Sequence, residues 1–130
     1  MDELPIKSGD DVVRVRQHVR AAAAVTGLSL VDQTKLVTAA SELARNALVH
    51  AGGGTARVEV ATSATGRAGI RITFTDEGPG IPDVGLALTD GWTTGEGLGL
   101  GLSGARRLVD EFKLASKPGE TSVIVAKWSR

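Results

Sequence analysis

Apolar residues recur at helical spacing over two segments in the first half of the chain. A first helix is predicted from about residue 10 to residue 25, and either Asp10 or Asp11 is a candidate for its capping residue. Its apolar face consists of Val12, Val15, Val19 and Ala22. A second helix is predicted over about 30–50. Its buried stripe consists of Leu36, Ala40, Leu43 and Ala47.

The rest of the chain contains the two-residue alternation of strands. The segments 57–61 and 70–75 predict a hairpin with a turn near Gly66, and segments 112–116 and 122–128 predict a closing hairpin. A helix is predicted between the hairpins, over about 105–112, and an edge strand over 4–8. This order predicts an α+β fold, a two-layer α/β sandwich whose helices cover one face of a mixed, mostly antiparallel sheet. No repeat or linker divides the chain, so we expect residues 1–130 to form a single domain.

Composition narrows the classes of function. The chain has 130 residues, with 15 acidic and 15 basic side chains, which argues against a general binder of nucleic acid or of membrane surfaces. It has no cysteine and only 2 histidines, so neither a disulfide framework nor a thiolate metal site is expected. The N-terminus lacks the apolar run of a signal peptide, and no apolar stretch has the length of a membrane span. We therefore expect a cytoplasmic protein.

Glycine occupies alternate positions over 95–101 and recurs at 104. Glycine has no side chain to bury and costs backbone entropy, so core packing does not explain this run. A glycine chain that leads into a helix directs backbone N–H groups at an anion, usually a phosphate. A mobile surface loop is the alternative interpretation.

Known phosphate-binding strings do not account for the run. Positions 99–104 match G-x-G-x-x-G, but that fingerprint must follow a buried strand, and the preceding residues 88–94 read as a loop. The chain contains no P-loop string, and it lacks the H-R-D and D-F-G strings of the eukaryote-type kinases.

Two polar clusters lie earlier in the chain. Glu42 and Asn46 are four residues apart on the second helix and so share one face beside its apolar stripe. An amide oxygen suits Mg²⁺, and a carboxylate suits a general base that orients a hydroxyl or a water. The alternative is a pair of ordinary polar residues on a solvated face.

The other cluster is Asp76-Glu77-Gly78-Pro79-Gly80-Ile81-Pro82, directly after a predicted strand. A carboxylate at a strand end can accept a hydrogen bond from an exocyclic amine such as that of adenine, and the two glycines let the backbone bend beside a ligand. A simple Pro-Gly turn is the alternative. The joint occurrence of all three clusters in this order favours a nucleotide site.

The three clusters together resemble the GHKL ATPase superfamily, which includes gyrase B, Hsp90, histidine kinases and MutL. Residues 41–47 resemble its N box, Asp76-x-Gly78-x-Gly80 its first glycine box and Gly97-x-Gly99-x-Gly101 its second. The resemblance implies the Bergerat fold with ATP and Mg²⁺ as cofactors. It implies that Asn46 ligates Mg²⁺, that Asp76 contacts adenine and that a lid extends over about 83–97. The other nucleotide contacts that it implies are Gly78, Gly80, Ile81, Gly95, Gly97, Leu98, Gly99, Leu100, Gly101 and Thr121.

Longer strings are similar to the RsbT-type serine kinases, the switch kinases of stressosome modules and relatives of anti-sigma factors. The strings are 38–46, 76–81 and 97–112, of which 104–112 is the most particular. The family implies transfer of the ATP γ-phosphoryl group to a serine or threonine of a STAS-domain partner, with Glu42 as the catalytic residue, and activation of a PP2C-type phosphatase. One departure concerns Thr121: the family usually carries adjacent Gly-Thr, whereas Glu120 separates Gly119 from Thr121 here.

Two alternatives to the switch kinase remain. One is an anti-sigma factor kinase that sequesters a sigma factor, because His50 stands where such relatives often carry histidine. The other is a non-catalytic binding module that uses ATP only to set its shape.

Overall fold

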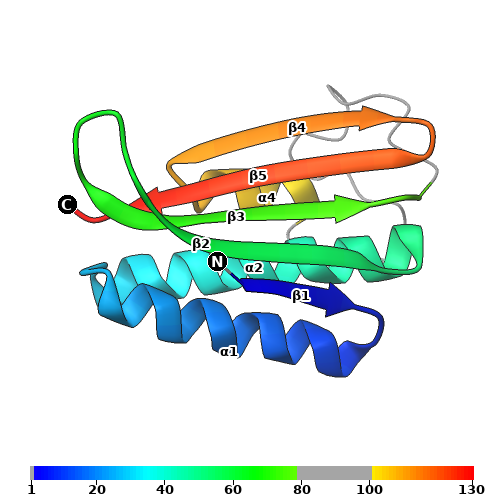
Figure 1. Cartoon of the computed structure of the whole chain (residues 1–130), viewed down its shortest axis with the longest axis horizontal. Coiled ribbons are helices and arrows are strands. Elements are labelled where there is room, and N and C mark those ends of the chain that lie inside the picture. The colour runs from blue at the N-terminus through cyan, green and yellow to red at the C-terminus, as the bar shows by residue number, and fades with distance from the viewer. Residues whose placement is uncertain (1, 79–100) are drawn as a thin grey trace.

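The computed structural model describes residues 2–78 and 101–130. These residues form a five-stranded sheet of order β1-β2-β3-β5-β4, in which every pair of neighbouring strands is antiparallel. The helices lie against one face of the sheet, which gives the predicted two-layer α+β arrangement (Figure 1). The elements are β1 (Asp2–Ile6), α1 (Gly9–Val25), α2 (Leu30–Ala51), β2 (Gly54–Thr62), β3 (Ala68–Asp76), α4 (Gly101–Arg107), β4 (Glu111–Lys117) and β5 (Glu120–Trp128).

The first helix confirms the predicted apolar face but begins differently. Its valines at 12, 15 and 19 are buried, and the helix starts at Gly9 after Ser8, which is the N-cap residue. The prediction that Asp10 or Asp11 caps the helix was therefore wrong in position. Asp11 instead reaches back from the first turn, where its carboxylate accepts the backbone N–H of Lys7 at 2.8 Å. The acidic side chain thus satisfies a donor just before the helix and complements the helix dipole.

The second helix is the longest element and spans 22 residues. Ser29 caps its start by accepting the Asp32 N–H at 3.1 Å, and all four residues of the predicted stripe are buried. The helix ends at Gly52, whose φ of +76° is in the left-handed region that glycine adopts without strain. The N–H groups of Gly52 and Gly53 then donate to the last helical carbonyls, those of Leu48 at 3.1 Å and Ala47 at 3.0 Å.

The hydrophobic core lies between the helices and the sheet. As the alternation predicts, alternate residues along most of the central strands face the helices and are buried, whereas Val60 near the end of β2 is exposed. These strand residues are Ala56, Val58, Ile70, Ile72, Phe74, Val123 and Val125. The core is therefore mainly aliphatic, and Phe74 is the one aromatic residue among the buried members of this cluster in the described part of the chain.

The region after α4 differs from the expectation. The helix predicted to extend to about residue 112 ends at Arg107, and β4 begins at Glu111. The stretch also has strand alternation, because Phe112 and Leu114 both face the core. Pairing with β5 decides in favour of the strand, as shown by the Asp110 N–H, which donates to the Ala126 carbonyl at 2.9 Å.

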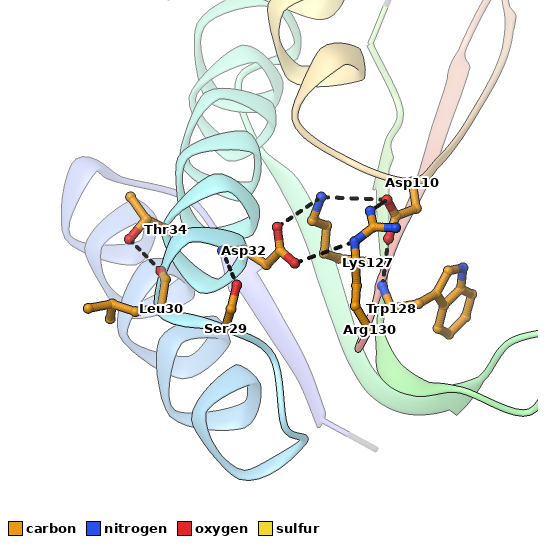
Figure 2. A network of polar contacts seen from close by, with 8 residues as sticks. All are labelled: Ser29, Leu30, Asp32, Thr34, Asp110, Lys127, Trp128 and Arg130. Atoms are coloured by element: carbon orange, nitrogen blue, oxygen red, sulfur yellow. Dashed lines mark hydrogen bonds and ion pairs between the residues drawn. The ribbon is translucent and has the colours of Figure 1, made fainter.

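Charged side chains close the end of the sheet opposite the β4–β5 turn. We call Asp32, Asp110, Lys127 and Arg130 the clasp (Figure 2). Lys127 is buried, with only 4% of its surface exposed, and its Nζ lies 3.5 Å from Oδ1 of both Asp32 and Asp110. The Nη2 of Arg130 lies 2.7 Å from Asp110 Oδ1. The buried ammonium is therefore balanced by two carboxylates, as a buried charge requires. The clasp ties the first turn of α2 to the end of β5 and to the turn before β4.

The pKa of Asp110 reflects competing effects. Burial raises the pKa of this carboxyl, but the Trp128 N–H, which donates to Oδ2 at 2.8 Å, and the charges of Lys127 and Arg130 lower it. The stabilising contacts outweigh burial, so the pKa lies below its ordinary value.

Candidate nucleotide site

The helix-covered face of the sheet turns polar at the end near the β4–β5 turn. Residues that lie opposite one another on β3, β5 and β4 form rows across this face. The row of Phe74, Val123 and Leu114 is apolar. The next row consists of Asp76, Thr121 and Ser116, and we call it the polar row. Its position continues the core face, so these side chains line the margin of the core.

Thr121 is the buried centre of the polar row, with 6% of its surface exposed. Its Oγ1 lies 2.8 Å from Ser116 Oγ, and it stands directly opposite Asp76 in the ladder. Side chains at opposed positions of antiparallel strands have Cβ atoms about 5 Å apart. Thr121 therefore lies beside Asp76, although Glu120 interrupts the usual Gly-Thr pair.

Asp76 is fixed by the turn that follows it. The Gly78 N–H donates to Asp76 Oδ1 at 3.0 Å, which leaves Oδ2 as a further acceptor. A Cβ on Gly78 would lie 2.5 Å from Cβ and 2.9 Å from Cα of Ala51, the last residue of α2. Only glycine therefore lets the end of β3 approach the end of α2 this closely.

The same helix carries the other two predicted side chains. Glu42 and Asn46 are both half-buried and flank the buried Leu43 and Ala47. Asn46 precedes Ala51 by about 7.5 Å along the helix axis, and Glu42 lies about 6 Å farther back, at the usual rise per residue. The Glu42 carboxylate pairs with Arg45, whose Nη1 lies 3.0 Å from Oε1. The close approach of Gly78 to Ala51 thus brings Asp76, the carboxylate expected to contact adenine, to the helix that carries Glu42 and Asn46.

The donor set fits a magnesium nucleotide better than a resident metal cage. Across 2–78 and 101–130, the structure contains no group of three or more His, Cys, Asp or Glu side chains that could hold a metal ion. Mg²⁺ takes few protein ligands when phosphates and water supply the others, and the amide oxygen of Asn46 is a hard oxygen ligand of the kind that this ion accepts. The acceptor Asp76 and the hydroxyl Thr121 beside it suit the edge of a base that carries an amine next to a ring nitrogen.

Several predicted residues lie outside the described part of the chain. They are Gly80, Ile81, Gly95, Gly97, Leu98, Gly99 and Leu100, together with the lid expected over 83–97. Gly101, the last glycine of the alternating run, is the first residue of α4.

Ser116 was not singled out from the sequence. The alternation of Phe112, Leu114 and Ser116 places a hydroxyl at the end of a core-facing series, which was the available signal. What the sequence lacks is the strand pairing that sets this hydroxyl against Thr121.

The comparisons with known proteins assign the chain to a family. Residues 31–129 match the family of histidine kinase-, DNA gyrase B- and HSP90-like ATPases, a range that includes the polar row, α4 and all of α2 except its first residue. The chain belongs to this ATPase family. Among the described residues, no helix combines the length and the apolar character needed to cross a membrane.

A curated relative narrows the assignment. The chain is 45% identical over 121 residues to the serine/threonine-protein kinase RsbT of Bacillus subtilis (strain 168), a match that covers 92% of this chain and 90% of the relative. Within the ATPase family, the chain therefore belongs to the RsbT-type serine/threonine kinases.

Solved structures share the fold at low identity. The RsbU and RsbW domains of Rv1364c from Mycobacterium tuberculosis match with a TM-score of 0.66 at 22% identity, over 100% of this chain and 33% of that longer chain. The mycobacterial sensor histidine kinase MprB matches with a TM-score of 0.55 at 21% identity, over 99% of this chain and 97% of that one.

Proposed function

We propose that this kinase transfers the γ-phosphoryl group of ATP to a serine or threonine hydroxyl of a STAS-domain partner and then binds and activates a PP2C-type phosphatase. The observation that carries the proposal is the junction of α2 with β3, where Gly78 contacts Ala51 and sets Asp76 near the helix of Glu42 and Asn46. The similarity to RsbT over 92% of the chain supports the reaction class.

The residues have distinct parts in this reaction. MgATP supplies the phosphoryl group and the cation that neutralises its charge. Asp76 accepts the amine of adenine, and Asn46 holds the magnesium ion. Glu42 orients the acceptor hydroxyl and receives its proton as the new P–O bond forms and the bond to the ADP oxygen breaks. We assign the glycines of 95–101 to the phosphates through their backbone N–H groups.

The direct test is incubation of the purified protein with MgATP and STAS-domain proteins of the same organism, followed by mass spectrometry of each STAS protein. The expected result is one added phosphate on a serine or threonine. ATP binding without a phosphate on any STAS partner would contradict the kinase proposal and favour a non-catalytic, ATP-gated module.

The activation of a phosphatase needs a separate measurement. A PP2C-type phosphatase that responds to this kinase should gain activity on its own phosphoprotein substrate when the kinase is added. The phosphorylated STAS protein should not compete for the kinase, whereas the unphosphorylated one should. Unchanged phosphatase activity at saturating kinase would remove this part of the proposal.

A further inference from the structure

The polar row contains a hydroxyl that the roles above do not use. Ser116 lies on β4 opposite Thr121, and the two hydroxyl oxygens are 2.8 Å apart. Thr121 separates Ser116 from Asp76 in the row, so Ser116 stands one strand farther from the base that Asp76 is proposed to bind. Any effect of Ser116 on the base therefore passes through Thr121.

A lone hydroxyl discriminates poorly between nucleotide bases, because it can donate or accept a hydrogen bond with equal ease. A neighbour that fixes the direction of its hydrogen removes this freedom. Ser116 is such a neighbour for Thr121, because its oxygen lies 2.8 Å from Thr121 Oγ1. When Ser116 donates, Thr121 Oγ1 accepts, and the Thr121 hydrogen is left for the side of the row where Asp76 lies.

We propose that Ser116 is a positioning residue for the nucleotide base, whose hydroxyl donates to Thr121 Oγ1 and so directs the Thr121 hydrogen towards a base acceptor beside Asp76. This inference rests on the proposed ATP site. Adenine offers an amine donor next to the acceptor N1, whereas guanine offers the reverse pattern, an acceptor next to an N1–H donor. With Ser116 as its donor, Thr121 presents a hydrogen rather than a lone pair, so the row matches adenine and repels guanine.

Burial makes the arrangement effective. Thr121 is 6% exposed, so water competes weakly for its hydrogen bonds, and a chain of hydroxyls in such a place is mutually strengthened. The neighbouring Ser122 provides a matched control, because it follows Thr121 on the same strand and its side chain lies on the opposite face of the sheet, in register with Thr75.

The test measures nucleotide affinity by calorimetry for ATP and for 1-deaza-ATP, which lacks the N1 acceptor. Ser116→Ala should weaken ATP binding about three- to tenfold, the range of one hydrogen bond. The same substitution should change the affinity for 1-deaza-ATP by less than roughly twofold, because this analogue has no N1 to accept the hydrogen of Thr121. Ser116→Thr should restore the preference for ATP, and Ser122→Ala should leave both affinities unchanged.

The outcomes separate this inference from the proposed function. If wild type binds ATP but Ser116→Ala keeps the wild-type ratio of the two affinities, the positioning role is overturned and the ATP site stands. If wild type binds neither nucleotide, both proposals fail. If Ser116→Ala does not fold, as judged by thermal unfolding, Ser116→Cys carries the same comparison, because a thiol fills the site and donates weakly.

Discussion

Glu42 does not stand alone on its helix, because the Arg45 guanidinium lies 3.0 Å from its carboxylate. The side chain of Glu42 is 13% exposed and that of Arg45 is 46% exposed, so the pair lies at the boundary of solvent. An ion pair one helical turn apart is worth little in stability at such a surface, but it limits the positions that the carboxylate can occupy. The ion pair thus favours one orientation of the Glu42 carboxylate, the proposed general base.

Replacing Glu42 by Gln tests its chemical role with little change in shape. The amide cannot take the proton of the acceptor hydroxyl, so phosphotransfer to the STAS partner should fall at least about a hundredfold, the usual size of general-base catalysis. ATP affinity by calorimetry should change less than about threefold, because Glu42 is not assigned to the nucleotide. Phosphotransfer at the wild-type rate would exclude Glu42 from the mechanism.

Asp76→Asn should act on binding itself. The amide can retain the Gly78 hydrogen bond through its oxygen, but its NH₂ group faces the amine of adenine as donor to donor. ATP affinity measured by calorimetry should fall about tenfold or more, the cost of an unpaired polar group. The matched control is Glu77→Gln at the exposed neighbouring carboxylate, which should bind ATP as wild type does.

The sequence indicated candidate site residues where the chemistry is local. Asp76 at a strand end and the pair Glu42 and Asn46 at helical spacing stood out from their neighbours as candidates, and their roles stay predictions. Ser116 was not, because its role depends on a register that sets two distant hydroxyls 2.8 Å apart.

At the scale of elements, the junction of α2 with β3 depends on Gly78. Gly78→Ala should lower the free energy of unfolding by about 2 kcal/mol, because the new methyl group meets both Cβ and Cα of Ala51 and forces the elements apart. Adding Ala51→Gly should recover only part of the loss, since the contact with Cα remains. Urea unfolding measures both effects.

Gly9→Ala serves as the control for this prediction. A Cβ on Gly9 would meet nothing within 4 Å, and the residue lies in the first turn of α1. The substitution should therefore be neutral or slightly stabilising. If Gly9→Ala lowered the free energy of unfolding as much as Gly78→Ala, the contact with Ala51 would not be the cause of the destabilisation.

The clasp gives the fold a defined response to acid. The pKa of Asp110 is lowered in the folded state, so its contribution to stability is complete above the ordinary carboxyl pKa and is lost as the pH falls through the folded value. Below about pH 5, the unfolding free energy of wild type should therefore drop more steeply than that of Asp110→Asn. At neutral pH the variant should be less stable by about 3 kcal/mol, since Lys127 loses a buried partner.

Urea titrations from pH 7 downward check this expectation. The variant retains Asp11, whose pKa is lowered chiefly by the Lys7 N–H, so some acid sensitivity should remain in both proteins. Parallel curves for wild type and Asp110→Asn would contradict the assignment.

Element types were predicted well where one periodicity dominated, as in α2, and poorly where two were compatible. Phe112 alternates with Leu114 as in a strand, but it also lies four residues after Leu108 as in a helix, and only pairing with β5 decides between the two. The clasp was also beyond sequence reasoning, because Asp32, Asp110 and Lys127 are far apart along the chain and meet only in the folded protein.

At the scale of the whole molecule, the order of elements was sufficient to predict the layers, and the order of the three clusters was sufficient to indicate the family. The identity of the partner belongs to this scale as well. A pull-down from a mixture of a STAS protein and a sigma factor should capture the STAS protein when a non-hydrolysable ATP analogue replaces ATP, because the STAS protein then stays unphosphorylated. Capture of the sigma factor alone would favour the anti-sigma alternative over the switch kinase.

The strand β5 carries Thr121 near one end and Lys127 near the other, so the polar row and the clasp are about 20 Å apart at the rise of an extended chain. Energetic effects at such a separation normally add without coupling. Robustness to heat and acid can therefore change at one end of this strand during evolution or engineering, while the nucleotide preference that we propose for the other end is retained.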